Sequence, residues 1–344
     1  MSKPRNLYPN TWLYVTVRCV HRSHRLVPTS SVQKVFAYCF GYVSSKYRQE
    51  WGMEFYEAQA LSTHYHLVLY DRDGKVADFL QDLNAMIARE LNAVRGTGGT
   101  FFAGEPGLQT VLGEERLFEH CVYTLANAVA AGLVHKTSRW KGFQSLRREY
   151  GEGVVVHKPR IGMWAKKKKK PRPVRRRSSS RAASRRGTRR AAARSGRGAY
   201  AGRSSLPETV TVVFDRPRIR MDRADTALRA EIRAALAKRE EEVRRERKGR
   251  RALGMKVVLA THWSTVPRRG EEMFGRNPTF STQTHEQRSA MKRLRRRFVR
   301  EHAAALARYN AGERDVVFPA GTVRMRLRHR VETDPTPLAL LLAG

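Results

Sequence analysis

A stretch of 55 residues without an acidic side chain divides this chain of 344 residues into three parts. Residues 153–207 contain no Asp or Glu, and Lys, Arg, Ser, Ala and Gly dominate the segment. Because so little apolar surface cannot offset the entropy lost on ordering, we expect a disordered basic linker. The chain should therefore comprise a first domain over residues 1–152, this linker, and a C-terminal region over residues 208–344.

The positive charge of the chain is concentrated in its second half. Residues 1–152 carry 18 Lys and Arg against 14 Asp and Glu, a net charge of +4. The remaining 192 residues carry 50 basic and 17 acidic side chains, a net charge of +33. A surplus of this size predicts a polyanionic partner. Nucleic acid is the commonest one, and an anionic membrane surface is the alternative.

Hydropathy and cysteine content indicate the compartment in which the protein is expected. No stretch approaches 18 consecutive apolar residues, and the N-terminus lacks the apolar core of a signal peptide, so we expect no membrane protein. Cys19, Cys39 and Cys121 are scattered and form no Cys-x-x-Cys pair. They are typical of reduced, buried cysteines in a cytoplasmic protein, and they predict neither a disulfide framework nor a zinc site.

The first domain alternates between strand and helix patterns. Its order, β-α-β-β-α-β, is that of a ferredoxin-like α+β fold. A further helix follows over residues 114–133. The strands are expected at residues 12–20, 53–60, 61–70 and 109–112, and the helices at residues 29–49 and 76–94.

Two histidines lie two positions apart on one of these strands. Because side chains at i and i+2 leave the same face of a strand, His64 and His66 should point to the same side. Two adjacent imidazoles make half of a site for a divalent metal ion. The alternative is that both histidines simply bind polar neighbours on one face of the sheet.

The helix over residues 114–133 has two distinct faces. One face is apolar and should pack on the sheet. The other carries Arg116, His120, Tyr123 and Asn127, of which Tyr123 and Asn127 are four residues apart and therefore adjacent. An ordinary solvated face with one tyrosine on it is the alternative interpretation.

The C-terminal region is predicted to be a small, basic α/β unit. We expect strands at residues 209–214 and 256–260 and a charged helix at residues 223–250. A capping box formed by Thr284 and Gln287 should start another helix that ends near Gly312. Non-specific phosphate contacts are expected from the basic side chains of the linker and of this last helix: Lys166, Lys167, Lys168, Lys169, Lys170, Arg175, Arg176, Arg177, Arg293, Arg296, Arg297 and Arg300.

The histidine strand and the tyrosine helix together resemble the HUH single-tyrosine transposases, and most closely their REP-associated branch. Thr63-His64-Tyr65-His66-Leu67 resembles the family's Asn-His-x-His-Leu strand, and residues 123–134 resemble its Tyr-x-x-x-Asn-Pro-Val-Arg-Ala-Gly-Leu-Val helix. Trp140 and Ser145 resemble the Trp and Ser that follow in the family. The resemblance covers residues 8–150. Ala128 and Ala130 depart from it, standing where the family has Pro and Arg.

The resemblance implies a catalytic domain with a defined chemistry. Tyr123 would be the nucleophile that forms a covalent 5′-phosphotyrosine link, and His64, His66 and Asn127 would hold Mg²⁺ or Mn²⁺. His120 and Arg116 are second-choice site residues on the same helix face. The expected protein is a nucleoid-associated cytoplasmic DNA transposase or nickase that acts on single-stranded or hairpin DNA, as a monomer or a homodimer.

Two alternatives belong to other functional classes. The first is a domesticated, non-catalytic DNA-binding protein that has kept the fold. The second is an RNA-binding protein, because basic residues that contact phosphates do not distinguish RNA from DNA. A covalent protein–DNA adduct would separate the transposase from both.

Overall fold

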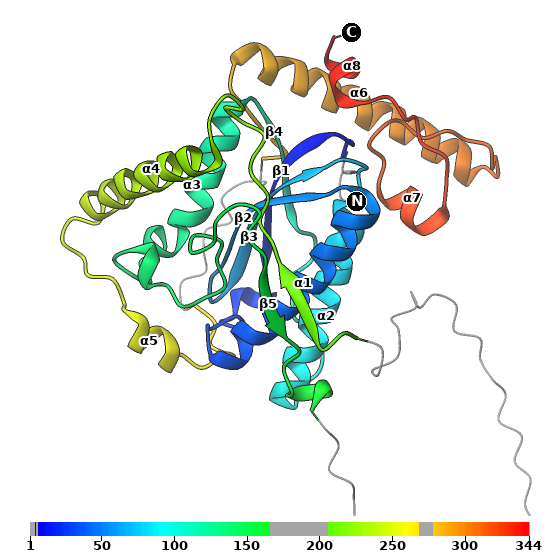
Figure 1. Cartoon of the computed structure of the whole chain (residues 1–344). Coiled ribbons are helices and arrows are strands. Elements are labelled where there is room, and N and C mark those ends of the chain that lie inside the picture. Colours follow the sequence, from blue (N-terminus) through cyan, green and yellow to red (C-terminus); the bar gives the residue numbers. More distant parts are fainter. Residues whose placement is uncertain (1–3, 5, 166–205, 268–277, 344) are drawn as a thin grey trace, which may run out of the picture.

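The computed structural model describes residues 4, 6–165, 206–267 and 278–343, and it has the expected mixed α+β class. A five-stranded sheet in the order β2-β3-β1-β4-β7 lies at its centre (Figure 1). Its strands are antiparallel except for the parallel pair β4–β7. They are β1 (Thr11–Arg18), β2 (Glu54–Ala60), β3 (His64–Asp71), β4 (Gly107–Leu112) and β7 (Phe280–Thr282).

Helices α1 (Ser30–Trp51) and α2 (Val76–Arg95) cover one face of this sheet (Figure 1). The side chain of Thr29 accepts the amide of Val32 at the start of α1, and Gly52 ends the helix with a φ of 56°. Apolar residues from both helices and from the odd-numbered positions of β1 form the largest buried cluster. The helical periodicity in the sequence therefore predicted this layer correctly.

Helices α3 (Glu114–Ala130) and α4 (Asp225–Glu246) cover the opposite face. Leu117, Cys121 and Leu125 of α3 pack against Tyr14 and Val68 of the sheet. Leu228, Ile232 and Leu236 bury the apolar side of α4 in the same cluster. A helix from the C-terminal region thus shares a core with the tyrosine-bearing helix.

A second, two-stranded sheet packs on α1. It pairs β5 (Val154–His157) with β6 (Thr209–Val212) in antiparallel register. Gly41 on α1 makes this contact possible, since a Cβ at that position would lie 2.9 Å from side-chain carbons of Val210 and Val212. Part of the expected linker is therefore a strand, because Val154–His157 find a pairing partner across the basic segment. Residues 166–205 of that segment lie outside the described residues.

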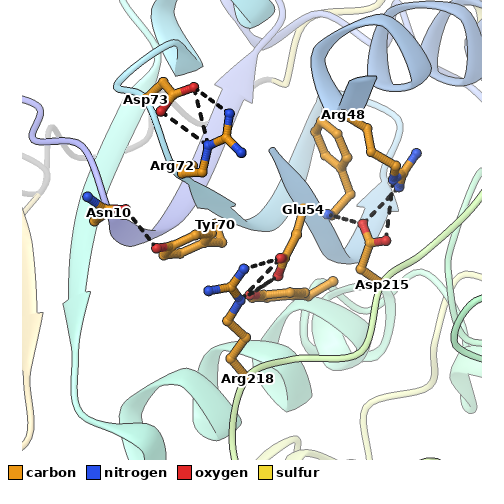
Figure 2. Close-up of polar contacts among 10 residues, drawn as sticks. Asn10, Arg48, Glu54, Tyr70, Arg72, Asp73, Asp215 and Arg218 are labelled. Atoms are coloured by element: carbon orange, nitrogen blue, oxygen red, sulfur yellow. Dashed lines mark hydrogen bonds and ion pairs between the residues drawn. The ribbon is translucent and has the colours of Figure 1, made fainter. Parts of the chain in front are cut away.

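The chain that follows β6 is held to β2 by two acidic side chains (Figure 2). Asp215 accepts hydrogen bonds from Arg48 of α1 at 2.8 Å and from the amide of Phe55 at 2.8 Å. Arg218 forms an ion pair with Glu54 and lies over the ring of Tyr70. These contacts join segments about 160 residues apart in the sequence.

The remaining helices are α5 (Met255–Ala260), α6 (His285–Asn310), α7 (Arg324–His329) and α8 (Leu338–Ala343). The expectation of a strand at residues 256–260 is wrong. Gly254 turns the chain with a φ of 81°, and the segment is a short helix that buries only Val258. The capping box of Thr284 and Gln287 is confirmed, and α6 ends two residues before Gly312.

Short 3-10 helices occur at Val20–Arg22, Thr137–Arg139 and Gly162–Trp164. All three cysteines are buried and free, as the sequence predicted. Among the described helices, none combines the length and the apolar character that crossing a bilayer requires.

Candidate functional site

The histidine pair lies on the face of the sheet that α3 covers. His64 and His66 of β3 project to this face, and their ring centroids are 4.8 Å apart. Tyr14 and Thr16 of β1 project to the same face, because β1 and β3 pair with Thr16 opposite His66. The shared face predicted by the two-residue spacing is therefore present.

Each imidazole has one nitrogen fixed by a hydroxyl group. Nδ1 of His66 lies 2.6 Å from the hydroxyl of Tyr14 and 3.0 Å from that of Thr16. Nδ1 of His64 lies 2.8 Å from the hydroxyl of Thr63. Nε2 of His66 is buried and has no hydrogen-bond partner in the described part of the chain. A buried nitrogen without a partner is costly, so this atom is suited to a ligand.

The electrostatic surroundings keep these imidazoles neutral. Burial lowers the pKa of His64 to about 4, and the nearby charges of Arg18 and Arg22 act in the same direction. The pKa of His66 is lowered well below its usual range, mainly by burial and also by His64. Neutral imidazole is the form that binds metal ions.

Tyr123 of α3 lies beside the histidine pair and is 48% exposed. Its ring centroid is 6.3 Å from that of His66 and 5.9 Å from that of Tyr14. His120, one turn earlier, stacks on Tyr14 at 4.6 Å. Burial, with a contribution from Arg116, lowers the pKa of His120 to about 4. Tyr14 therefore lies at the centre of a cluster formed by His66, His120 and Tyr123.

Asn127 joins this cluster from one turn further along α3. It is buried, and its side-chain nitrogen donates to the carbonyl oxygen of Tyr123 at 2.8 Å. Its side chain also lies close to the phenol of Tyr14. Burial raises the pKa of that phenol, and the hydrogen bond with Asn127 opposes the increase. The amide oxygen of Asn127 is not used by the hydrogen bond to Tyr123.

Arg116 occupies the edge of the site. It forms an ion pair with Glu119 at 2.5 Å and donates to the carbonyl oxygen of Thr282 on β7 at 2.9 Å. A mostly apolar cavity of about 380 Å³ lies between α3, α4 and β7. Arg116, His120 and Tyr123 contribute to its wall. The structure thus places Arg116 beside Tyr123 but already engaged by protein groups.

Two buried polar side chains hold α3 at its position on the sheet. Gln59 of β2 donates to the carbonyl oxygen of Leu125 and accepts the amide of Ala128, both at 2.8 Å. The hydroxyl of Thr137 also donates to Leu125, at 2.9 Å. These bonds bracket Asn127 and fix the register between the helix and the histidine strand.

The donor set fits a divalent metal ion. Two neutral imidazoles, one with a buried and unpartnered nitrogen, share a cluster around Tyr14 with the side chain of Asn127, and a set of two imidazole nitrogens and an amide oxygen suits several first-row ions. The described residues contain no cluster of three His, Cys, Asp or Glu side chains that would hold a metal. A third protein ligand would therefore have to be an uncharged oxygen such as that of Asn127.

The predicted phosphate-contacting residues do not gather at this cluster. Arg293, Arg296 and Arg300 are exposed on α6, and Arg297 is half-buried there. α6 packs on β7, which β1 and β4 separate from the histidine strand. Residues 166–170 and 175–177 lie outside the described residues.

Tyr14, Thr16, Arg18 and Gln59 belong to the site, but the sequence did not point to them. A usable signal for three of them was present, because Tyr14, Thr16 and Arg18 alternate along β1 and must share a face. Gln59 gave no such signal, because its role depends on contact with a helix 66 residues away.

Comparisons with known proteins returned two transposases among solved structures. The first is a REP-associated tyrosine transposase bound to a REP hairpin. It shares 18% identity and covers 43% of this chain and 85% of its own, with a TM-score of 0.35. The second is assigned as a transposase from Deinococcus radiodurans R1. It shares 17% identity and covers 34% and 90% of the two chains, with a TM-score of 0.25. No family model and no curated protein matches.

Proposed function

We propose that this protein is a single-tyrosine DNA transposase or nickase that cleaves and rejoins single-stranded or hairpin DNA. The observation that carries the proposal is the position of Tyr123. It is a half-exposed tyrosine whose ring lies 6.3 Å from the buried His66, which forms a neutral pair with His64. A tyrosine that serves only in packing usually has a buried ring, whereas that of Tyr123 is half exposed. An ordinary surface tyrosine has no reason to lie beside a pair of neutral histidines.

The proposed reaction is a transesterification at phosphorus. The hydroxyl oxygen of Tyr123 attacks the scissile phosphate, forms a P–O bond, and displaces the 3′-hydroxyl of the neighbouring nucleotide. The phenolic proton would pass to His120, which is neutral and lies one turn earlier on α3, and the departing 3′-oxygen would take up a proton and leave as the 3′-hydroxyl. Because one phosphodiester replaces another, the strand can be rejoined by the reverse reaction without ATP.

His64, His66 and Asn127 are the residues that would hold Mg²⁺ or Mn²⁺. A bound ion would supply neutralisation of the charge that develops on the phosphate. The chain itself holds the imidazoles in place through Tyr14, Thr16 and Thr63, and it keeps them in the neutral form. Gln59 keeps Tyr123 and Asn127 in register with them.

The same proposal gives a role to the scaffold. The unit β1-α1-β2-β3-α2-β4 would be a ferredoxin-like catalytic domain, with α3 added as the tyrosine-bearing helix. The protein would act at the nucleoid, and its oligomeric state is left open.

The decisive test is the covalent adduct. Inverted repeats beside the gene would be synthesised as hairpin oligonucleotides and incubated with the protein and Mn²⁺. We expect a protein–DNA adduct that EDTA prevents, and we expect the nucleotide on Tyr123 in the mass spectrum of the adduct peptide. Tyr123→Phe should abolish cleavage and the adduct while leaving folding and DNA binding intact, because only an exposed hydroxyl is removed.

Tyr70→Phe is the matched control, since its hydroxyl donates to Asn10 at the far end of β3 and its loss should leave cleavage unchanged. His64→Ala should reproduce the effect of EDTA. Asn127→Ala should lower activity and be partly rescued by additional Mn²⁺. An adduct on any other tyrosine, or normal cleavage by Tyr123→Phe, would refute the assignment.

A further inference from the structure

An arginine-rich loop follows β1 at the end of the sheet where the histidine strand begins. The amide of Cys19 donates to the carbonyl oxygen of Thr63, and that of Leu26 donates to Ser62, both at 2.8 Å. The loop is therefore attached to the turn that leads into His64. Arg22 and the residue before it, His21, have left-handed φ angles of 52° and 51°, which non-glycine residues rarely adopt.

Two arginines at this end lie between two aromatic rings. The guanidinium of Arg95, at the end of α2, is 5.4 Å from the ring centroid of Phe101 and 5.0 Å from that of Trp263. The guanidinium of Arg25 is 5.5 Å and 5.4 Å from the same two rings. Arg95 also donates to the carbonyl oxygen of Arg25 at 2.5 Å. Four side chains thus form one compact cage.

Trp263, the fourth side chain of the cage, comes from the C-terminal half of the chain. The amide of His24 donates to the carbonyl oxygen of Thr265 at 3.1 Å, and Nδ1 of His24 lies 2.9 Å from the same oxygen. This pair of contacts holds residues 263–265 against the arginine loop. Trp263 is therefore fixed over the two guanidinium groups by backbone hydrogen bonding as well as by its ring.

The two positive charges in the cage lack a counterion in the described part of the chain. The Nη1 atoms of Arg25 and Arg95 are buried and have no hydrogen-bond partner there, and neither side chain forms an ion pair with a described Asp or Glu. Burial lowers the pKa of Arg95 to about 10, and the charge of Arg25 contributes. Nε of Arg25 donates to the hydroxyl of Ser23 and Nη2 of Arg95 to the carbonyl oxygen of Arg25, but these neutral partners do not offset two adjacent positive charges. Two half-buried like charges without a counterion are unfavourable, so the cage is best explained by an anion that it binds.

Aromatic faces cannot satisfy the edges of the guanidinium groups. The rings contact the guanidinium groups through their faces, whereas the N–H groups of a guanidinium point outward in its own plane and match the oxygens of a phosphate. Arg18, paired with His64 between β1 and β3, lies at the same end of the sheet as the loop that carries Arg25. An anion held at the cage would therefore be close to the strand that carries the histidine pair.

We propose that Arg25 and Arg95, enclosed by Phe101 and Trp263, bind a backbone phosphate of the single-stranded DNA on which the protein acts. The inference rests on the proposed function. It names a contact with the DNA strand at a phosphate other than the one that is cleaved. The cage binds charge and stacks no base, so it would not read sequence.

The test measures DNA binding in the Tyr123→Phe protein, so that no covalent step contributes. Binding of oligo(dT) would be followed over a range of salt concentrations for Arg25→Gln/Arg95→Gln. Each lost phosphate contact on a single strand lowers the magnitude of the slope of log K against log salt by about 0.7, so we expect a decrease of about 0.7 for the one phosphate that the cage holds. The matched control is Arg160→Gln/Arg233→Gln, which removes two exposed arginines that already pair with Glu208 and Glu149.

The proposal is overturned if the double variant and its control have the same slope while both melt like the parent.

A second measurement does not depend on the folding of that variant. Oligo(dT) should change the tryptophan fluorescence of the parent more than that of Trp263→Phe, and an identical change in both proteins would also overturn it. If inorganic phosphate alone produces the full change at Trp263, and oligo(dT) binds no more tightly, the site takes a free anion instead of DNA. A normal adduct with an unchanged salt slope would refute this site alone, whereas an altered slope without an adduct would refute only the proposed reaction.

Discussion

Glu57 and Arg229 form a fully buried ion pair between β2 and α4. Their side chains are 0% and 1% exposed. Glu57 also accepts from Ser145 and from Tyr150, the latter at 2.9 Å. Arg229 donates to the carbonyl oxygens of Ser145 and Arg148 at 2.7 and 2.9 Å. Such a pair persists only when nearly every lone pair and N–H group has a partner. Here the buried Nε of Arg229 is the exception among the described contacts of the pair.

Removing one member of this pair should be far more harmful than removing both. Arg229→Met leaves a buried carboxylate without compensation, and we expect a loss of about 3–5 kcal/mol in the free energy of unfolding. Combining it with Glu57→Met should restore most of that loss, since two apolar side chains of similar volume then fill the space. Urea unfolding of the two single variants and the double variant measures the coupling. Additive effects in the double-mutant cycle would contradict the account.

At the scale of single residues, local spacing predicted which side chains lie on the same face of one strand or helix. It did not predict contacts between side chains of different elements. His64 with His66, and Tyr123 with Asn127, follow from the periods of a strand and a helix, and the structure brings all four together. The Glu57–Arg229 pair joins residues 172 positions apart, and the Arg25–Trp263 contact joins residues still further apart in the sequence. No local pattern encodes such contacts, so only the folded structure reveals them.

Among the elements, the long periodic ones were predicted, whereas the short strands β5 and β7 and the short helix α5 were not. α1, α2, α3 and α6 follow their apolar periodicity closely. β5 and β7 have four and three residues, and their strand conformation depends on the partners β6 and β4. α5 contains β-branched residues that favour a strand, yet no strand pairs with it and one buried side chain suffices for its packing.

Asp71 connects the end of β3 to the start of α2 and gives this junction a pH dependence. Its carboxylate accepts the amides of Lys75 and Val76 at 2.8 and 2.9 Å. Burial nevertheless raises its pKa from 3.8 to about 6, outweighing those two bonds and the charge of Arg326. The folded state therefore binds a proton that the unfolded state has released between pH 4 and 6. The resulting stability is complete below about pH 4 and is lost as the pH rises through 6.

Asp71→Asn should remove this dependence, because the side chain no longer ionises. The two backbone amides bind different oxygens of Asp71, so the single oxygen of Asn accepts only one of them, and this loss should be the same at every pH. The raised pKa corresponds to about 3 kcal/mol. The stability of the variant relative to the parent should thus improve by up to that amount between about pH 4 and pH 7. Urea unfolding at both pH values measures it, with the exposed Asp222→Asn as a control for net charge, because the charge of Asp73 itself contributes to the raised pKa of Asp71. A difference between variant and parent that stays constant with pH would contradict the assignment.

For the whole molecule, the chain folds back on itself and does not form a row of separate units. β6 extends a small sheet with β5, β7 extends the central sheet beside β4, and α4 shares a buried cluster with α3 (Figure 1). Phe214 and Val212 complete the main core on the α1 face. The high charge of the second half concealed this integration in the sequence, since a basic composition suggested a separate region that contacts nucleic acid.

The two ends of the basic segment meet at the β5–β6 pair. His157 lies opposite Thr209, and the amide of Lys158 donates to the carbonyl oxygen of Glu208 at 2.7 Å. Lys158 also forms an ion pair with Glu208 at 3.0 Å. The residues between these points can therefore be shortened without changing the course of the described chain.

Replacing residues 166–203 with a short Gly/Ser loop should separate DNA affinity from the fold. The deleted sequence holds 17 Lys and Arg and no acidic residue. Its loss should weaken binding to every DNA sequence alike and lower the salt slope by more than the loss of Arg25 and Arg95 does, because more phosphates lose a cation. The melting temperature should not change, since β5 and β6 still pair. Binding to unrelated oligonucleotides at several salt concentrations gives the result, and an unchanged slope would show that the segment acts only as a tether.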